Sequence, residues 1–113
     1  MAKVEIVDSL AKEIKKKFKG ESYKIVQLLR GLEKNPNKGK PLGHAMGFTI
    51  KEIKHKRFRF YFILDRTNIN LLSREELTNL LIRFIRMSNK NHQQKTVDEI
   101  KKILVKLGPH GFE

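Results

Sequence analysis

The sequence contains no cysteine and no tryptophan. Without cysteine the chain can form no disulfide, thiolate metal site, iron–sulfur cluster or cysteine nucleophile. Four histidines are scattered along it without an HExxH pattern, so a bound catalytic metal is not expected. The patterns GxxxxGK[ST], GxGxxG and GxSxG are also missing, which argues against a nucleotide-phosphate loop and an α/β-hydrolase. Any catalysis would use His, Lys, Arg, Tyr or carboxylates, and no small-molecule cofactor is expected.

Acidic residues are scarce: 12 Asp and Glu stand against 25 Lys and Arg, giving a formal charge of +13 over 113 residues. Such an excess favours a polyanionic partner, with nucleic acid ahead of a membrane surface. No apolar run approaches the roughly 20 residues of a membrane-spanning helix, and the N-terminus lacks an apolar signal core. We therefore expect one cytoplasmic domain over residues 1–113, without a membrane partner.

The N-terminal part predicts a short edge strand over residues 2–7, with Val4 and Ile6 on one side. A helix capped by Asp8 then runs to Gly20, and a second helix begins at a Ser22 cap and stops at Asn35–Pro36. The two helices form a hairpin with the apolar positions Leu10, Ala11, Ile14 and Phe18, then Ile25, Leu28, Leu29 and Leu32. Residues 35–47, with their prolines and glycines, read as a loop.

Two strands are predicted over residues 48–54 and 57–64. The residues of the second strand alternate between two faces. The face expected in the core carries Phe58, Phe60, Phe62 and Leu64, and the basic face carries Arg57, Arg59, Tyr61 and Ile63. Two guanidinium groups beside an aromatic ring suit RNA, because Arg can bind phosphates while Tyr stacks on an unpaired base. A merely solvated sheet face is the alternative.

The remaining pattern is partly ambiguous. A polar turn at 65–68 could lead into a short returning strand at 68–72, and Ser73–Glu76 has the form of a capping box. Residues 77–87 have helical spacing, slightly favouring a helix, but residues 80–87 would also suit a central strand. A last helix is expected from a Thr96–Glu99 capping box to Gly108–Pro109, burying Ile100, Ile103, Leu104 and Leu107.

Two stretches concentrate positive charge. Residues 54–66 have five basic side chains against Asp65, and residues 77–97 contain no acid while holding Arg83, Arg86, Lys90, His92 and Lys95. His55 and His92 fall within these stretches, where an imidazole could transfer protons near pH 7, although a surface role is the alternative for each. His44 and His110 are expected to be surface residues.

The order of motifs along the chain resembles that of the RelE/ParE toxin superfamily: a helical hairpin, then NPNKGKPL, then IKEIKHKRFRFYFIL, then FIRMSNKNHQQKTVDEIKKIL. The last stretch resembles the HigB-type branch of that superfamily. The resemblance covers roughly residues 4–107. It implies an α+β fold in which the N-terminal hairpin packs on a small, curved antiparallel sheet, followed by a C-terminal helix. The other sheet face would form a basic groove, and residues 79–87 would be a strand.

The resemblance also implies a function: ribosome-dependent, metal-independent cleavage of mRNA, neutralised by an acidic antitoxin protein. It places Lys54 and Arg59 as groove cations, with Arg83 or Arg86 and His92 near the active-site residues of the last strand. We take His92, Lys54, Arg59 and Arg86 as catalytic candidates. The RNA-binding candidates are Arg57, Tyr61, Arg83, Lys90, Lys95 and His55.

Two departures from the family pattern stand out. Many members use a late tyrosine in catalysis, whereas no Tyr follows Tyr61 here, so His92 would have to replace it. Residues 66–77 resemble an insertion between the third and fourth strands. A non-cleaving RNA- or ribosome-binding relative and, third, a ParE-like gyrase inhibitor therefore stay open.

Overall fold

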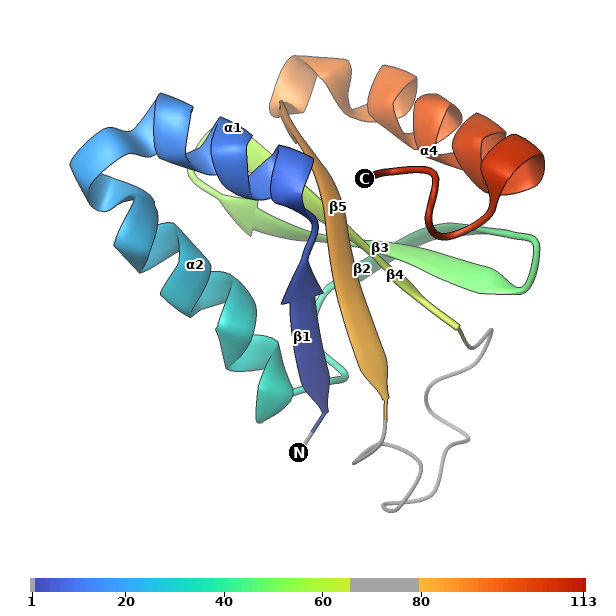
Figure 1. The fold of residues 1–113 in the computed structure, drawn as a ribbon, viewed down its shortest axis with the longest axis horizontal. Helices are drawn as coiled ribbons and strands as arrows, with labels where there is room; N and C mark the ends of the chain where they lie inside the picture. Colours follow the sequence, from blue (N-terminus) through green and yellow to red (C-terminus); the bar gives the residue numbers. More distant parts are fainter. Residues whose placement is uncertain (1, 66–79) are drawn as a thin grey trace.

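The computed structural model describes residues 2–65 and 80–113, which form a mixed α+β structure around a five-stranded sheet (Figure 1). The strand order is β1-β5-β4-β3-β2. The strands are β1 Lys3–Ile6, β2 Lys40–Ala45, β3 Phe48–His55, β4 Phe58–Leu64 and β5 Leu81–Asn89. The helices are α1 Asp8–Phe18, α2 Ser22–Arg30 and α4 Gln93–Leu107, with 3₁₀ turns η1 Lys19–Glu21, η2 Gly31–Glu33 and η4 Lys90–His92.

Helices lie on both faces of the sheet. On the α1 face, the Phe18 ring packs edge-on against Phe58, with 5.0 Å between ring centroids. The same face carries Phe60 and Phe62, both fully buried in one core with the α2 residues Ile25 and Leu29. This confirms the predicted alternation for Phe60 and Phe62, and the predicted apolar stripe of α2.

The opposite face is not an open basic surface. Helix α4 contacts β5 and β2 and covers much of it, so Tyr61 and Ile63 of β4 are as buried as the phenylalanines. The expectation that β4 exposes this whole face is therefore wrong. Arg59, nearer the strand start, stays half-exposed because it lies toward the beginning of α4 rather than under its middle.

Residues 81–87 are strand, so the helix favoured by spacing is wrong there and the strand implied by the family resemblance is confirmed. The β4–β5 register passes from Tyr61↔Arg86 to Phe62↔Phe84, leaving Ile85 as an extra, bulged residue. A bulge breaks the two-residue alternation, and a strand covered on both faces is apolar almost throughout. Those two effects produced the helix-like spacing.

Two further expectations about the sheet need correction. The sheet is not wholly antiparallel, because β1 pairs parallel with β5, for example Val4 opposite Ile82. Residues 35–47 are not all loop, because Lys40–Ala45 form β2 despite the proline and glycine they contain. Pro41 is tolerated there because β2 is an edge strand with a register shift between Pro41 and Gly43. The predicted edge position of β1 is confirmed.

Helix boundaries differ from the predicted ones by several residues. Asp8 and Ser22 are first residues of α1 and α2 rather than caps, and no side chain caps either helix. α1 and α2 also end earlier than expected, because 3₁₀ turns follow Phe18 and Arg30. α4 begins at Gln93, so Thr96 lies inside it and donates a hydrogen bond to the His92 carbonyl.

The buried stripe of α4 moves accordingly. It includes Val97 with Ile100 and Leu104, while Leu107 is 68% exposed. The predicted strand at 68–72, the Ser73–Glu76 box, Arg66 and the 66–77 insertion lie outside the described residues. Within the described ranges, no helix has both the length and the apolarity needed to cross a membrane.

Candidate nucleic-acid interface

A hollow of about 420 Å³ opens beside β3, at the point where β2 begins; we call it the basic hollow. The β2–β3 ladder ends at the Lys40–Glu52 pair, so the next part of β3 borders this space. Its lining comes from five parts of the fold: Leu28 of α2, Lys38, Gly39 and Lys40 before and within β2, Glu52, Ile53 and Lys54 of β3, Arg59 of β4 and Gln93 of α4. Four cations thus surround one carboxylate among the described residues.

Lys54 and Arg59 are directly opposite each other in the β3–β4 register. Like charges in that position repel each other, and a bound anion would relieve the repulsion. The Arg59 Nη1 group donates to the backbone oxygens of Phe58 (3.1 Å) and Lys56 (3.4 Å), which holds the guanidinium near the β3–β4 turn. The structure therefore brings together two of the predicted catalytic residues.

Lys38 and Lys40 are functional candidates that sequence reasoning did not single out. They flank Gly39, whose φ of +109° favours glycine and whose Cα lies so close to β4 that a Cβ would come within 2.8 Å of the Phe62 ring. Beside it, the buried Lys51 donates to the Asn37 carbonyl at 3.2 Å. Burial lowers the pKa of Lys51 below its ordinary value. The GKP sequence within residues 35–47 was the feature of the sequence that could have pointed to Lys38 and Lys40.

Glu52 is also new to the site. It is only 6% exposed, and its Oε2 accepts a hydrogen bond of 2.9 Å from Gln93 Nε2. Gln93 is the first residue of α4, so this bond joins the start of the helix to the centre of β3. A carboxylate in this hollow could not be inferred from sequence, because Gln93, Lys38 and Lys40 come near Glu52 only through the tertiary fold.

His92 lies in η4, next to α4, and its side chain is exposed. Its Nδ1 is 2.8 Å from Asn89 Oδ1, and since that oxygen accepts, Nδ1 donates. Nε2 then keeps its lone pair and can take up a proton. The imidazole is not among the groups that line the basic hollow. Its neighbour Lys90 is exposed and donates its backbone N–H to the Arg57 carbonyl at 2.9 Å.

Arg86 and Arg83 make ion pairs away from the hollow. Arg86 Nε donates to Glu99 of α4 at 3.1 Å, and its guanidinium lies 5.0 Å from the Phe112 ring centre. Arg83 is buried with Glu5, Glu113 and His110 around it. The predicted uncompensated positive surface at 77–97 is therefore wrong for these two arginines, because acids from distant parts of the chain pair with them.

Tyr61 is fully buried, and its hydroxyl is 2.8 Å from Ser88 Oγ. Burial raises the pKa of the phenol above its ordinary value, against a smaller opposing effect of the Ser88 hydrogen bond. A ring in this position cannot stack on an RNA base unless α4 moves away from the sheet. The remaining RNA-binding candidates do not lie together. Arg57 is exposed and directly precedes β4, and His55 is the last residue of β3, opposite Phe58.

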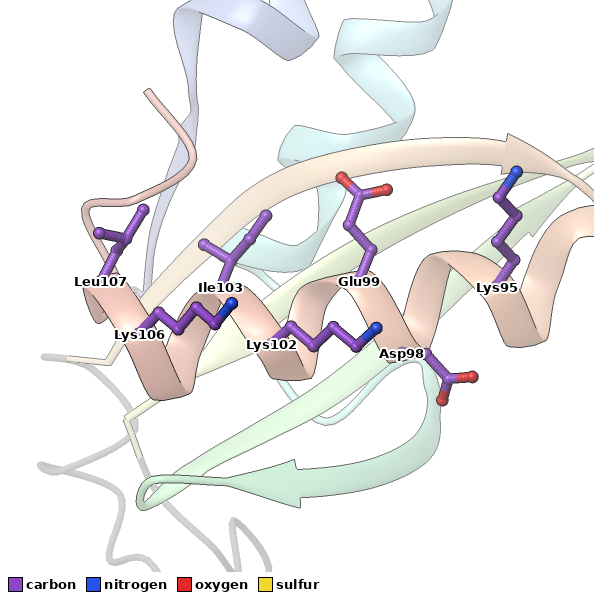
Figure 2. A pocket seen from close by; sticks show the side chains of 7 residues that line it. All are labelled: Lys95, Asp98, Glu99, Lys102, Ile103, Lys106 and Leu107. Carbon is purple, nitrogen blue, oxygen red and sulfur yellow. The ribbon is translucent and has the colours of Figure 1, made fainter.

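Lys95 belongs to a second, larger hollow of about 720 Å³ along α4. Figure 2 shows its lining side chains following one helix instead of converging: Lys95, Asp98, Glu99, Lys102, Ile103, Lys106 and Leu107. It mixes both charge signs with aliphatic groups and gathers no catalytic constellation. In the part of the chain that the structure describes, no cluster of three or more His, Asp or Glu could hold a metal ion.

Comparison of this chain with family models, curated proteins and solved structures finds no match. The likeness to the RelE/ParE superfamily accordingly rests on the sequence motifs themselves, and the site has to be interpreted from its own geometry.

Proposed function

We propose that this protein binds single-stranded RNA in the basic hollow and, as a RelE-like toxin, cleaves mRNA on the ribosome. The observation that carries the proposal is the convergence of Lys38, Lys40, Lys54 and Arg59 on one hollow that contains a single carboxylate. Cations from separate segments that meet at one concave surface can contact neighbouring phosphates of one strand together, which scattered surface charges do not.

Cleavage without a metal would proceed through attack of the ribose 2′-oxygen on the adjacent phosphorus, with departure of the 5′-oxygen and formation of a cyclic phosphate. Lys54 and Arg59 would stabilise the charge that develops on the phosphate oxygens. His92 would take the 2′-proton through Nε2, and water would give a proton to the departing 5′-oxygen. Arg86 would take part only after exchanging Glu99 for RNA, because the two side chains are paired.

The proposal also includes a RelE-like arrangement of helices and sheet, and an acidic antitoxin as the protein partner. The mixed α+β fold with its five-stranded sheet supports the first part, and the charge of +13 favours an acidic antitoxin that competes with RNA.

A non-cleaving RNA- or ribosome-binding protein is the second candidate. It is favoured by the position of His92, which is exposed beside Asn89 and does not line the hollow that holds Lys54 and Arg59. A binding protein needs the cations alone, whereas a nuclease also needs a proton-transfer group at the scissile bond.

The test combines purified protein with ribosome-bound mRNA and measures cleavage and ribosome affinity separately. We expect the wild type to cleave, His92→Ala to lose about 10² to 10⁴ in rate while still binding, and Arg59→Ala to weaken both. His44→Ala, at an exposed position of β2, is the matched control and should behave as wild type.

The outcomes separate the candidates. Binding without cleavage by the wild type supports the non-cleaving protein, and wild-type cleavage by His92→Ala removes that residue from the mechanism. Absence of binding to RNA and ribosomes at low salt excludes both candidates.

A further inference from the structure

The inner part of the basic hollow differs chemically from its rim. Lys38, Lys40 and Lys54 are exposed, whereas Glu52 and Ile53 are buried. Leu28 adds a second aliphatic group, and Gln93 adds an amide. Because neighbouring residues of β3 point to opposite faces, Ile53 lies with Leu28 on the α2 side of the sheet, whereas Glu52 meets Gln93 on the α4 side. The Glu52–Gln93 pair forms a floor on the α4 side, next to the cations Lys54 and Arg59.

This floor is unsuited to a phosphate. The oxygens of the buried Glu52 carboxyl group accept hydrogen bonds and would oppose the oxygens of a phosphate placed on the floor. A nucleobase has no such conflict, because the donors on its polar edge can meet the Glu52–Gln93 pair. Phosphates on either side of that base would then meet the rim lysines and Arg59.

The hydrogen-bonding pattern of the floor discriminates among bases. Gln93 Nε2 donates one of its two N–H groups to Glu52, so the amide keeps one donor and its oxygen, and the carboxylate keeps its remaining lone pairs. The carboxylate is an acceptor only. Guanine offers two adjacent donors, N1–H and N2–H, on one edge and can pair with a carboxylate through both. Adenine and cytosine offer one amino group, and uracil offers a single N–H between two carbonyl oxygens.

We propose that the basic hollow is a base-recognition site in which the Glu52 carboxylate, held by Gln93, selects a guanine of single-stranded RNA. This rests on the proposed RNA-binding function and adds a base preference to it. It also gives Glu52 a role, since a buried acid among four cations would otherwise weaken an RNA site.

The experiment uses four fluorescent five-nucleotide RNAs, all uracil except for a central G, A, C or U, with anisotropy titrations at low salt. We expect the wild type to bind the guanine RNA about tenfold more tightly than the all-uracil RNA, with adenine and cytosine between them. Glu52→Gln should reduce this ratio to less than about twofold. Its affinity for the all-uracil RNA should be equal or higher, since the change removes a negative charge.

Asp98→Asn is the matched control, because it makes the same charge change on the exposed surface of α4 and should keep the guanine preference. Gln93→Ala, at a half-buried position of the lining, removes the amide that holds Glu52 and provides a second test should Glu52→Gln fail to fold. It should abolish the preference while phosphate-driven binding persists.

Failure of this inference and failure of the proposed function look different. Salt-dependent binding of all four RNAs with equal affinity, or an unchanged guanine preference in Glu52→Gln, overturns base recognition and leaves RNA binding in place. No binding of any of the four RNAs by the wild type overturns both.

Discussion

Arg59, Arg83 and Arg86 carry the same guanidinium group but meet different neighbours. Arg59 donates to backbone carbonyls at the rim of the hollow, where its charge can attract an anion. Arg86 is paired with Glu99, and Arg83 lies between Glu5 and Glu113. A charge whose partner is an acid of the same chain must lose that partner before it binds RNA, so Arg59 is the arginine most available to an RNA phosphate among these three.

Phe60 tests the packing of the α1 face. The ring is fully buried and its centroid is 6.2 Å from that of Phe18. Truncation leaves a cavity, so we expect Phe60→Ala to lower the free energy of unfolding by about 3 to 5 kcal/mol in denaturant titrations. Tyr23→Ala, with Tyr23 70% exposed, is the control and should change it little. A loss under about 1 kcal/mol for Phe60→Ala would contradict the assigned core position.

Lys51 makes stability depend on pH. Burial lowers the pKa of Lys51 in the folded protein below its ordinary value of 10.5. Between the two pKa values the unfolded chain binds more protons, so this residue makes the folded protein more stable as pH rises toward 10.5. We expect Lys51→Met to gain stability relative to wild type at pH 7 and to lose that advantage as the pH approaches 10. A difference that stays constant from pH 7 to 10 in urea titrations would refute this.

At the scale of elements, β3 and β4 were predictable because both are rich in aromatic and β-branched residues, and because β4 also alternates between two faces. The strand β5 was not predictable from periodicity alone, since the bulge at Ile85 and burial on both faces erase the alternation. The parallel pairing of β1 with β5 joins segments about 80 residues apart, which no local pattern reports.

The candidate site likewise divides into residues that a local pattern indicates and residues that only the tertiary fold brings in. Lys54 and Arg59 could be found because both lie on a readable hairpin. Glu52, Gln93, Lys38 and Lys40 join them through the tertiary fold, by the start of α4 and by the segment before β2. The acids that pair with Arg83 and Arg86 come from β1, α4 and the segment after it, so a charge count along 77–97 could not include them.

Gly39 controls the segment that carries Lys38 and Lys40. At φ +109°, a Cβ would come within 2.8 Å of the Phe62 ring and 3.1 Å of the Glu52 carbonyl oxygen. We expect Gly39→Ala to cost about 1 to 3 kcal/mol of stability and to weaken RNA binding by displacing both lysines. The control is Gly20→Ala, where a Cβ meets nothing within 4 Å, and it should be neutral or slightly stabilising. Equal behaviour of the two variants in unfolding and anisotropy titrations would show that the close approach is unimportant.

Over the whole molecule the charge of +13 attracts any polyanion, but the arrangement of charges limits how many can act together. The hollow along α4 mixes lysines with Asp98 and Glu99, whereas the basic hollow contains four cations and one buried acid. Specific contacts should therefore come from the basic hollow, and the remaining lysines should contribute a general attraction that salt screens.

The salt dependence of RNA binding measures this division. Each phosphate contact with a single strand contributes a slope of about −0.7 in log affinity against log salt, so contacts from Lys38, Lys40, Lys54 and Arg59 predict a slope of about −3. Lys54→Gln should make the slope shallower by about 0.7 and weaken binding at low salt. Lys15→Gln, an exposed lysine of α1 that does not line the hollow, removes the same charge and should leave the slope nearly unchanged. Equal slopes for the two variants would mean that net charge, and not the basic hollow, governs binding.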